Sequence, residues 1–204
     1  MTSSSGTLTS PWRGSCHGST SAEPNPAHHA LATIEAWAKS KNRPFDLITQ
    51  NVDGLHGNHV TECHGSAQYM RCTNRYCKNG PPAGLIEWDD GLLKKFRANP
   101  GLATTPRCPA CAKYLRPHVL WFDEQYSGHY RYGLDHIERL IEQMTVLIFV
   151  GTSFAVTITD MMMTGGYERG IPMFVIDPHG QEVDGMTYIK AKAEDFLPEL
   201  AAAL

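Results

Sequence analysis

Short apolar runs that alternate with helical patterns are the feature of this sequence that most restricts its fold. Two apolar runs have the length of a strand: residues 146–150, followed by a glycine, and Met173–Ile176, followed by an aspartate. Apolar residues with helical spacing precede the first run at 134–144, separate the two runs at 156–163 and close the chain near 193–204. Strands separated by helices favour parallel pairing, so we predict an α/β fold with a Rossmann-like parallel sheet covered by helices.

The N-terminal residues do not show this alternation of apolar runs and helical patterns. Residues 1–24 are rich in Ser, Thr, Gly and Pro, and we expect them to form a flexible tail. Asn25 followed by Pro26 is a typical helix start, and the apolar spacing that follows predicts a helix to about Lys41. Residues 45–49 then read as a short buried strand.

Between residues 71 and 117 the composition changes, because Cys, Gly, Pro and Asn dominate and only one helix is expected, at 90–98. We interpret this segment as a small inserted module. The α/β domain would then comprise residues 25–70 and 118–204.

The cysteines of the inserted module predict a metal site. Of the six cysteines in the chain, four form two short-spaced pairs, Cys72 with Cys77 and Cys108 with Cys111. Such spacing lets both sulfurs of a pair turn toward one ion, and four thiolates leave no open position, which indicates a structural zinc. The alternatives are chance pairs of free or disulfide-bonded thiols, or a zinc ribbon that binds nucleic acid.

Charge and hydropathy indicate which classes of binding partner the chain favours. The net charge of −3 does not favour nucleic-acid binding, although basic residues do surround the cysteines: Arg71, Arg75, Lys78, Arg107, Lys113 and Arg116. No apolar run is long enough to span a bilayer and no signal core is visible at the N-terminus, so we expect no membrane partner. We therefore expect an intracellular protein, cytoplasmic by default, with the nucleus and the mitochondrion left open.

A dense polar stretch follows the first predicted strand. Residues 49–66, TQNVDGLHGNHVTECHGS, contain several side chains that a core strand could not bury without partners: Gln50, Asn51, Asp53, His56, His59 and His64. The carboxyl end of a strand in an open α/β sheet is where ligands bind. We therefore expect these polar residues to face a cleft.

Several motifs in order resemble one family. TQNVDGLH, CHG, the two cysteine pairs, LRPHVLWFDE, GTS and VID are together similar to the sirtuins, which are NAD-dependent protein deacylases. The resemblance extends from about Asn25 to the closing AEDFLPEL. It implies an enzyme that transfers the acyl group of an acylated lysine to ADP-ribose and releases nicotinamide, with NAD as cofactor and acylated-lysine proteins or peptides as substrates.

The resemblance also implies roles for individual residues. His64 would be the catalytic base, and Gln50, Asn51 and Asp53 would line the part of the NAD site that holds the nicotinamide ribose. The alternatives are that His64 is a structural histidine and that Asn51 and Asp53 cap a turn.

Further positions carry over from the later motifs. Leu120 and Phe122 match the walls of the acyl-lysine tunnel, in a segment that pairs as a strand with the substrate peptide. The remaining cofactor positions are Gly151, Thr152, Ser153 and Asp177, although sirtuins often carry an Asn in place of Asp177. We take acetyl as the default acyl group.

The chain departs from the family before Asn25, where the Gly-Ala-Gly turn and the cofactor loop of sirtuins are not found. Because that turn supplies N–H groups to the pyrophosphate, we expect the chain as it stands to bind NAD weakly. The alternative function is a truncated or degenerate sirtuin-like binding module with little or no catalytic activity.

Overall fold

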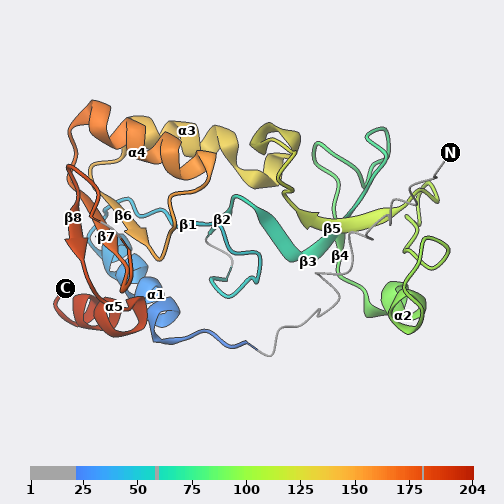
Figure 1. Cartoon of the computed structure of the whole chain (residues 1–204), viewed down its shortest axis with the longest axis horizontal. Helices are drawn as coiled ribbons and strands as arrows, with labels where there is room; N and C mark the ends of the chain where they lie inside the picture. Colours follow the sequence, from blue (N-terminus) through green and yellow to red (C-terminus); the bar gives the residue numbers. More distant parts are fainter. Residues whose placement is uncertain (1–21, 58–59, 181) are drawn as a thin grey trace, which may run out of the picture. The chain divides into compact units, whose positions relative to one another are not determined.

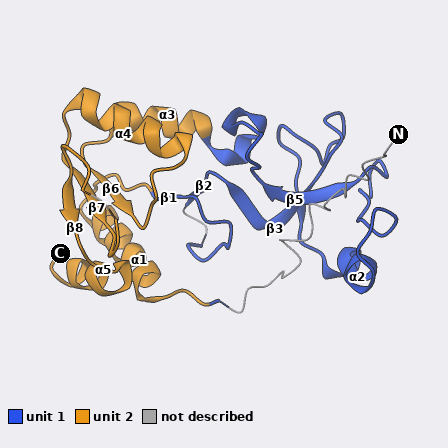
Figure 2. Ribbon diagram, in the orientation of Figure 1, with its two compact units in different colours: residues 1–22, 47–133 blue, residues 23–46, 134–204 orange. Residues whose placement is uncertain are grey.

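The computed structural model describes residues 22–57, 60–180 and 182–204 (Figure 1). Most of the predicted tail, residues 1–24, lies outside these ranges. The described chain forms two compact units (Figure 2). Unit 1 comprises residues 47–133 together with Ala22, and unit 2 comprises residues 23–46 and 134–204.

Unit 2 contains the predicted parallel sheet. Its strands are β6 (Leu147–Val150), β7 (Met173–Ile176) and β8 (Thr187–Ile189), in the order β6-β7-β8 with every pairing parallel. Val150 pairs with Ile176, so the carboxyl ends of β6 and β7 lie at the same edge. The α/β fold with a parallel sheet is thereby confirmed.

Helices cover both faces of this sheet (Figure 1). On one face α1 (Pro26–Ser40) packs beside α5 (Ala193–Ala202), and their apolar side chains form a core with Ile176 of β7. Helix α1 begins where the sequence predicts, because the Asn25 side chain accepts hydrogen bonds from two backbone N–H groups and Pro26 takes the first helical position.

The other face carries α3 (Leu134–Gln143) and α4 (Thr157–Arg169). Helix α4 runs past the predicted end at residue 163, through two glycines that commonly interrupt helices. A Cβ at Gly165 would lie 2.3 Å from Ile141 of α3, and one at Gly166 would lie 2.4 Å from Met173 of β7. The glycines therefore allow α4 to approach its neighbours closely, and this packing offsets their low helix propensity.

Unit 1 is built mainly from antiparallel strands. A three-stranded sheet has the order β4-β3-β5; its strands are β3 (Gly65–Cys72), β4 (Ile86–Glu87) and β5 (Leu115–Val119). Two short strands precede this sheet in the sequence, β1 (Ile48–Thr49) and β2 (Thr61–Glu62), and they pair with each other in parallel. The strand predicted at 45–49 is therefore too long, since only its last two residues pair.

The core of unit 1 joins this sheet to one helix. Helix α2 (Asp90–Ala98) lies where the sequence predicts and buries Leu93 and Phe96 against Met70 of β3 and Leu115 of β5. The predicted module of residues 71–117 lies inside unit 1, which also takes in residues on either side of it. No helix within the described ranges is both long and apolar enough to cross a bilayer.

Candidate functional site

His64 lies in a tight turn between β2 and β3, and the glycine after it makes that turn possible. Gly65 has a φ of +83°, and a Cβ at this position would lie 2.1 Å from the carbonyl oxygen of His118 on β5. The Leu120 N–H, just beyond β5, donates a hydrogen bond to the His64 carbonyl at 2.8 Å. The backbone on both sides of His64 is therefore held against the end of β5.

Both ring nitrogens of His64 have partners. Nδ1 lies 3.0 Å from the carbonyl oxygen of Gln50, and Nε2 lies 3.0 Å from the hydroxyl of Tyr126. Because a carbonyl can only accept, Nδ1 must carry the proton, and the lone pair of the neutral ring is on Nε2. Burial lowers the pKa of His64, while the Gln50 carbonyl acts to raise it. The ring is thus a neutral base with a defined tautomer near pH 7.

The other polar residues of the TQNVDGLH motif form the loop after β1. Gln50 offers its carbonyl to His64, and Asn51 is exposed with its N–H bonded to the Thr49 hydroxyl at 3.1 Å. The Asp53 carboxylate accepts a hydrogen bond from the Leu55 N–H at 3.0 Å. Asp53 therefore caps a turn, and its second carboxylate oxygen is not used in that bond.

The segment after β5 is a turn in this structure. Leu120 is partly buried and Phe122 is fully exposed. The Glu124 N–H donates to the Trp121 carbonyl at 2.9 Å, which closes the turn. Tyr126 then begins a short 3₁₀ helix, Tyr126–Gly128, and reaches His64 from there.

Ion pairs that the sequence did not predict anchor this turn, and we call them the ion cluster. The Glu124 carboxylate accepts hydrogen bonds from Arg71 at 2.9 Å and from Arg116 at 2.6 and 2.9 Å. It also accepts one from the Trp121 N–H at 3.1 Å. Burial alone would raise the pKa of Glu124, but the bonds from Arg116 and Trp121 and the two guanidinium charges lower it below its usual range.

The same cluster bears on the nucleic-acid alternative. Arg71 and Arg116 are only 5% and 6% exposed, and both are engaged by Glu124. Two of the six basic residues near the cysteines therefore do not contribute to a basic surface. The ion cluster joins positions 53 residues apart in sequence, for Arg71 and Glu124, which explains why local patterns could not show it.

The later cofactor positions lie in unit 2 at the carboxyl ends of neighbouring strands. Gly151, Thr152 and Ser153 follow β6, and Asp177 follows β7. Gly151 has a φ of +57°, and apart from its two chain neighbours no residue in the described ranges has an atom within 4 Å of the place where its Cβ would be. The Asp177 carboxylate accepts a hydrogen bond from the His179 N–H at 2.7 Å. This edge of the sheet is the usual ligand edge of an open α/β fold.

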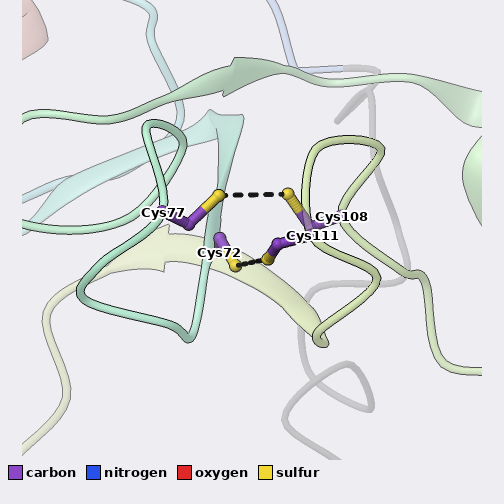
Figure 3. A group of neighbouring side chains, drawn as sticks. All are labelled: Cys72, Cys77, Cys108 and Cys111. Atoms are coloured by element: carbon purple, nitrogen blue, oxygen red, sulfur yellow. Dashed lines mark hydrogen bonds between the residues drawn. The ribbon is translucent and has the colours of Figure 1, made fainter.

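The four paired cysteines converge on one point of unit 1 (Figure 3). Cys72 ends β3, Cys77 lies in the following loop, and Cys108 and Cys111 lie in the loop that precedes β5. Their sulfurs all lie within 4.8 Å of one another; the Cys72–Cys111 and Cys77–Cys108 distances are 3.5 and 3.7 Å. A disulfide would need about 2.05 Å, so these are free thiols.

This arrangement fits a tetrahedral metal. With zinc–sulfur bonds of about 2.3 Å, neighbouring sulfurs of a tetrahedral site are about 3.8 Å apart, close to the two short distances. Amide groups of the surrounding loops point at the sulfurs: the Asn74 N–H lies 3.3 Å from Cys72 Sγ and the Asn79 side chain lies 3.5 Å from Cys108 Sγ. Such donors stabilise thiolate ligands. The donor set therefore suits a structural zinc ion with no open coordination position.

Comparisons with known proteins identify the family of the chain. Residues 8–158 match the model of the Sir2 family. The chain is 32% identical over 184 residues to NAD-dependent protein deacetylase 1 of Pyrobaculum aerophilum, covering 87% of this chain and 65% of the relative. It is 30% identical over 192 residues to NAD-dependent deacetylase sir2E of Dictyostelium discoideum, covering 89% of this chain and 54% of the relative.

A solved structure gives the same result. A Sir2 homologue in complex with NAD superposes with a TM-score of 0.68 at 29% sequence identity, covering 90% of this chain and 65% of that protein. The chain thus spans between about half and two thirds of the length of these relatives. The family match covers more than half of the chain and the fold agrees with it. This chain belongs to the Sir2 family.

Proposed function

We propose that this protein is an NAD-dependent protein-lysine deacylase, with acetyl as the default acyl group, which transfers the acyl group to ADP-ribose and releases nicotinamide. The observation that carries the proposal is His64, a half-buried neutral histidine whose tautomer is set by the Gln50 carbonyl. Relatives that bear the names NAD-dependent protein deacetylase and deacylase support it.

In this proposal, bound NAD supplies an electrophilic ribose carbon and the nicotinamide leaving group. His64 accepts the proton of a ribose hydroxyl at Nε2, the nitrogen that carries the lone pair. The Nδ1–H group stays bonded to the Gln50 carbonyl, 3.0 Å away, and this bond stabilises the imidazolium that results. The chemistry of the base therefore needs only the side chain of one residue and the backbone of another.

We assign the remaining polar residues of the loop after β1 to the cofactor. Gln50, Asn51 and Asp53 would contact the nicotinamide ribose. An exposed amide can donate to and accept from sugar hydroxyls, and the carboxylate oxygen of Asp53 that does not bind the Leu55 N–H can accept from them, which supports the roles of Asn51 and Asp53.

The positions in unit 2 would serve the rest of NAD. Gly151, Thr152 and Ser153 would let the cofactor approach the backbone, since the space beside Gly151 is open. Asp177 would accept hydrogen bonds from the adenine ribose, with the oxygen that does not bind His179.

The substrates in this proposal are acylated-lysine proteins or peptides. Leu120 and Phe122 would line the acyl-lysine tunnel, and the exposed turn that carries Phe122 would pair with the substrate backbone. Arg71 is held by Glu124 at 2.9 Å and so is not available to bind an acidic acyl chain, which supports acetyl as the default.

Zinc and compartment follow from the cysteines. The four thiols would hold one structural zinc, and residues 71–117 would be the zinc module within an α/β domain of residues 25–70 and 118–204. A reducing compartment, the cytoplasm by default, suits thiols that serve a metal.

Nicotinamide release tests the proposal. The purified protein would be incubated with NAD and either an acetyl-lysine peptide or the same peptide without the acetyl group. Release that requires both NAD and the acetyl group is expected. Equal release with the two peptides would indicate simple NAD hydrolysis and would contradict the proposal.

A further inference from the structure

The catalytic nitrogen of His64 is already occupied by a side chain of the same protein. Tyr126 places its hydroxyl 3.0 Å from Nε2, and the two rings lie 5.9 Å apart at an interplanar angle of 28°. Since Nδ1 carries the proton, the neutral ring can only accept at Nε2, and the tyrosine hydroxyl must be the donor. The lone pair that a base needs is therefore engaged in an internal hydrogen bond.

Two sets of hydrogen bonds hold the residues next to Tyr126 and His64. Glu124, two residues earlier, is bound by Arg71 and by two nitrogens of Arg116. On the other side, the His64 carbonyl accepts the Leu120 N–H at 2.8 Å, which fixes the histidine to the start of the same turn. The backbone of His64 and the turn that carries Tyr126 are therefore held at both ends, and the contact between the two side chains lies between these fixed points.

The turn that follows Tyr126 lies at the protein surface. Ser127 and Gly128 are exposed, and among the described residues other than its two chain neighbours none has an atom within 4 Å of the position that a Cβ on Gly128 would take. Tyr126 itself is only partly buried. The exposed side of the turn gives the Tyr126 side chain a route into solvent, while Glu124 holds the preceding residues through its hydrogen bonds to Arg71 and Arg116.

We infer that the Tyr126 hydroxyl is a gate on His64: it occupies Nε2 in the state seen here and must leave before a ribose hydroxyl can donate to that nitrogen. The inference rests on the proposed function, because it concerns the same base. Nε2 of a neutral imidazole has one lone pair and accepts one hydrogen bond, so the tyrosine and the sugar compete for it. Tyr126 is thereby a positioning residue that acts through His64.

Chemical labelling of His64 tests the occupancy of Nε2 without NAD. Diethyl pyrocarbonate reacts with an unprotonated imidazole nitrogen, and mass spectrometry of the peptide that contains His64 gives its rate. In Tyr126→Phe the ring remains and only the hydroxyl is lost, so we expect labelling to be about 2- to 10-fold faster, as the loss of one hydrogen bond allows. An unchanged rate would overturn the inference.

Two controls belong to this measurement. Tyr130→Phe removes a hydroxyl from an exposed tyrosine of the next 3₁₀ turn, and His64 should then react at the parent rate. His136, on α3, serves as an internal standard whose rate should be equal in all three proteins. A faster reaction at both histidines would indicate loosening of the whole protein and would count against a specific gate.

Steady-state kinetics separate a gate from a proton relay. A gate predicts that Tyr126→Phe lowers KM for NAD about 2- to 10-fold without lowering kcat, since a competitor for Nε2 is gone. A relay through the tyrosine predicts a large loss of kcat and would contradict the gate. If parent and variant were both inactive while labelling showed a released Nε2, the proposed function would fail and the occupancy of Nε2 by Tyr126 would stand.

Discussion

At the scale of single residues, the surroundings of His64 suit the role of base that we propose for it. Its backbone is held by the Gly65 turn and by Leu120, and its tautomer is set by Gln50. The sequence predicted the histidine itself through the CHG motif. It could not predict the contact with Tyr126, because the two residues are 62 positions apart in sequence.

The first prediction concerns His64→Ala. We expect deacylation to fall about 10²- to 10⁴-fold, the usual effect of removing a general base. The fold should survive, since His64 is only half buried. His136→Ala, which alters a surface pair with Asp46, is the matched control and should leave the activity unchanged. The measurement is the rate of peptide deacetylation at saturating NAD. Full activity of His64→Ala would refute the role of His64 as the base.

The second prediction concerns pH and His118. This residue is 1% exposed, both ring nitrogens lack a hydrogen-bond partner among the described residues, and burial together with nearby cations lowers its pKa to about 3. In the unfolded chain His118 therefore takes up a proton as the pH falls through about 6.5, whereas in the folded chain it stays neutral until the pH approaches 3. Stability should be greatest above that pH and fall as the pH decreases toward 3, by up to about 1.4 kcal/mol per pH unit from this residue.

Urea unfolding at several pH values measures this effect. His118→Phe keeps an aromatic ring against Tyr132, with which His118 stacks at 5.0 Å, and removes the titrating group. We expect the variant to show a shallower loss of stability in acid. Equal slopes for the two proteins would show that His118 does not contribute.

At the scale of secondary-structure elements, periodic patterns predicted the elements that depend on local sequence. Helix α2, strand β7 and the start of α1 lie where apolar spacing and the Asn25-Pro26 cap placed them. Strands β3 and β5 were not predicted, because their paired residues are 43 to 54 positions apart in sequence and β3 has no simple alternation of buried and exposed residues. Helix α4 was predicted too short because its glycines have a packing role that only the structure shows.

The third prediction concerns the cysteine loops as an element. The two loops bring four sulfurs together, and the surrounding core of Met70, Leu93, Phe96 and Leu115 packs against them. We expect one zinc per chain, lost in the double variant Cys108→Ala and Cys111→Ala, and we expect chelation to unfold or aggregate the protein because metal binding and folding are coupled. Cys63→Ala, outside the cluster, should keep its zinc.

Metal analysis of the purified proteins gives the answer. A parent protein without zinc, or a double variant that keeps a full complement, would contradict the assignment. Iron in place of zinc would leave the tetrahedral site intact but change the metal.

At the scale of the whole molecule, the chain has two units with separate cores. The core of unit 1 includes Cys72 and Cys108 and packs against Cys77 and Cys111, and that of unit 2 joins the parallel sheet to α1 and α5. The α/β class was predictable because the strands and helices of unit 2 alternate in sequence. The limits of the units were not predictable. Strands β1 and β2 and the turn around Tyr126 fall in the same unit as the cysteine loops because of contacts between residues distant in sequence.

The central claim is that this protein transfers an acyl group from lysine to ADP-ribose with His64 as the base. Its most direct test is mass spectrometry of the products formed from NAD and a peptide whose acetyl group carries an isotopic label. We predict that the label appears in an acetyl-ADP-ribose in amounts equal to the deacetylated peptide and to nicotinamide, and that His64→Ala abolishes this product. Label found only in the intact peptide, or released as free acetate without consumption of NAD, would contradict the account.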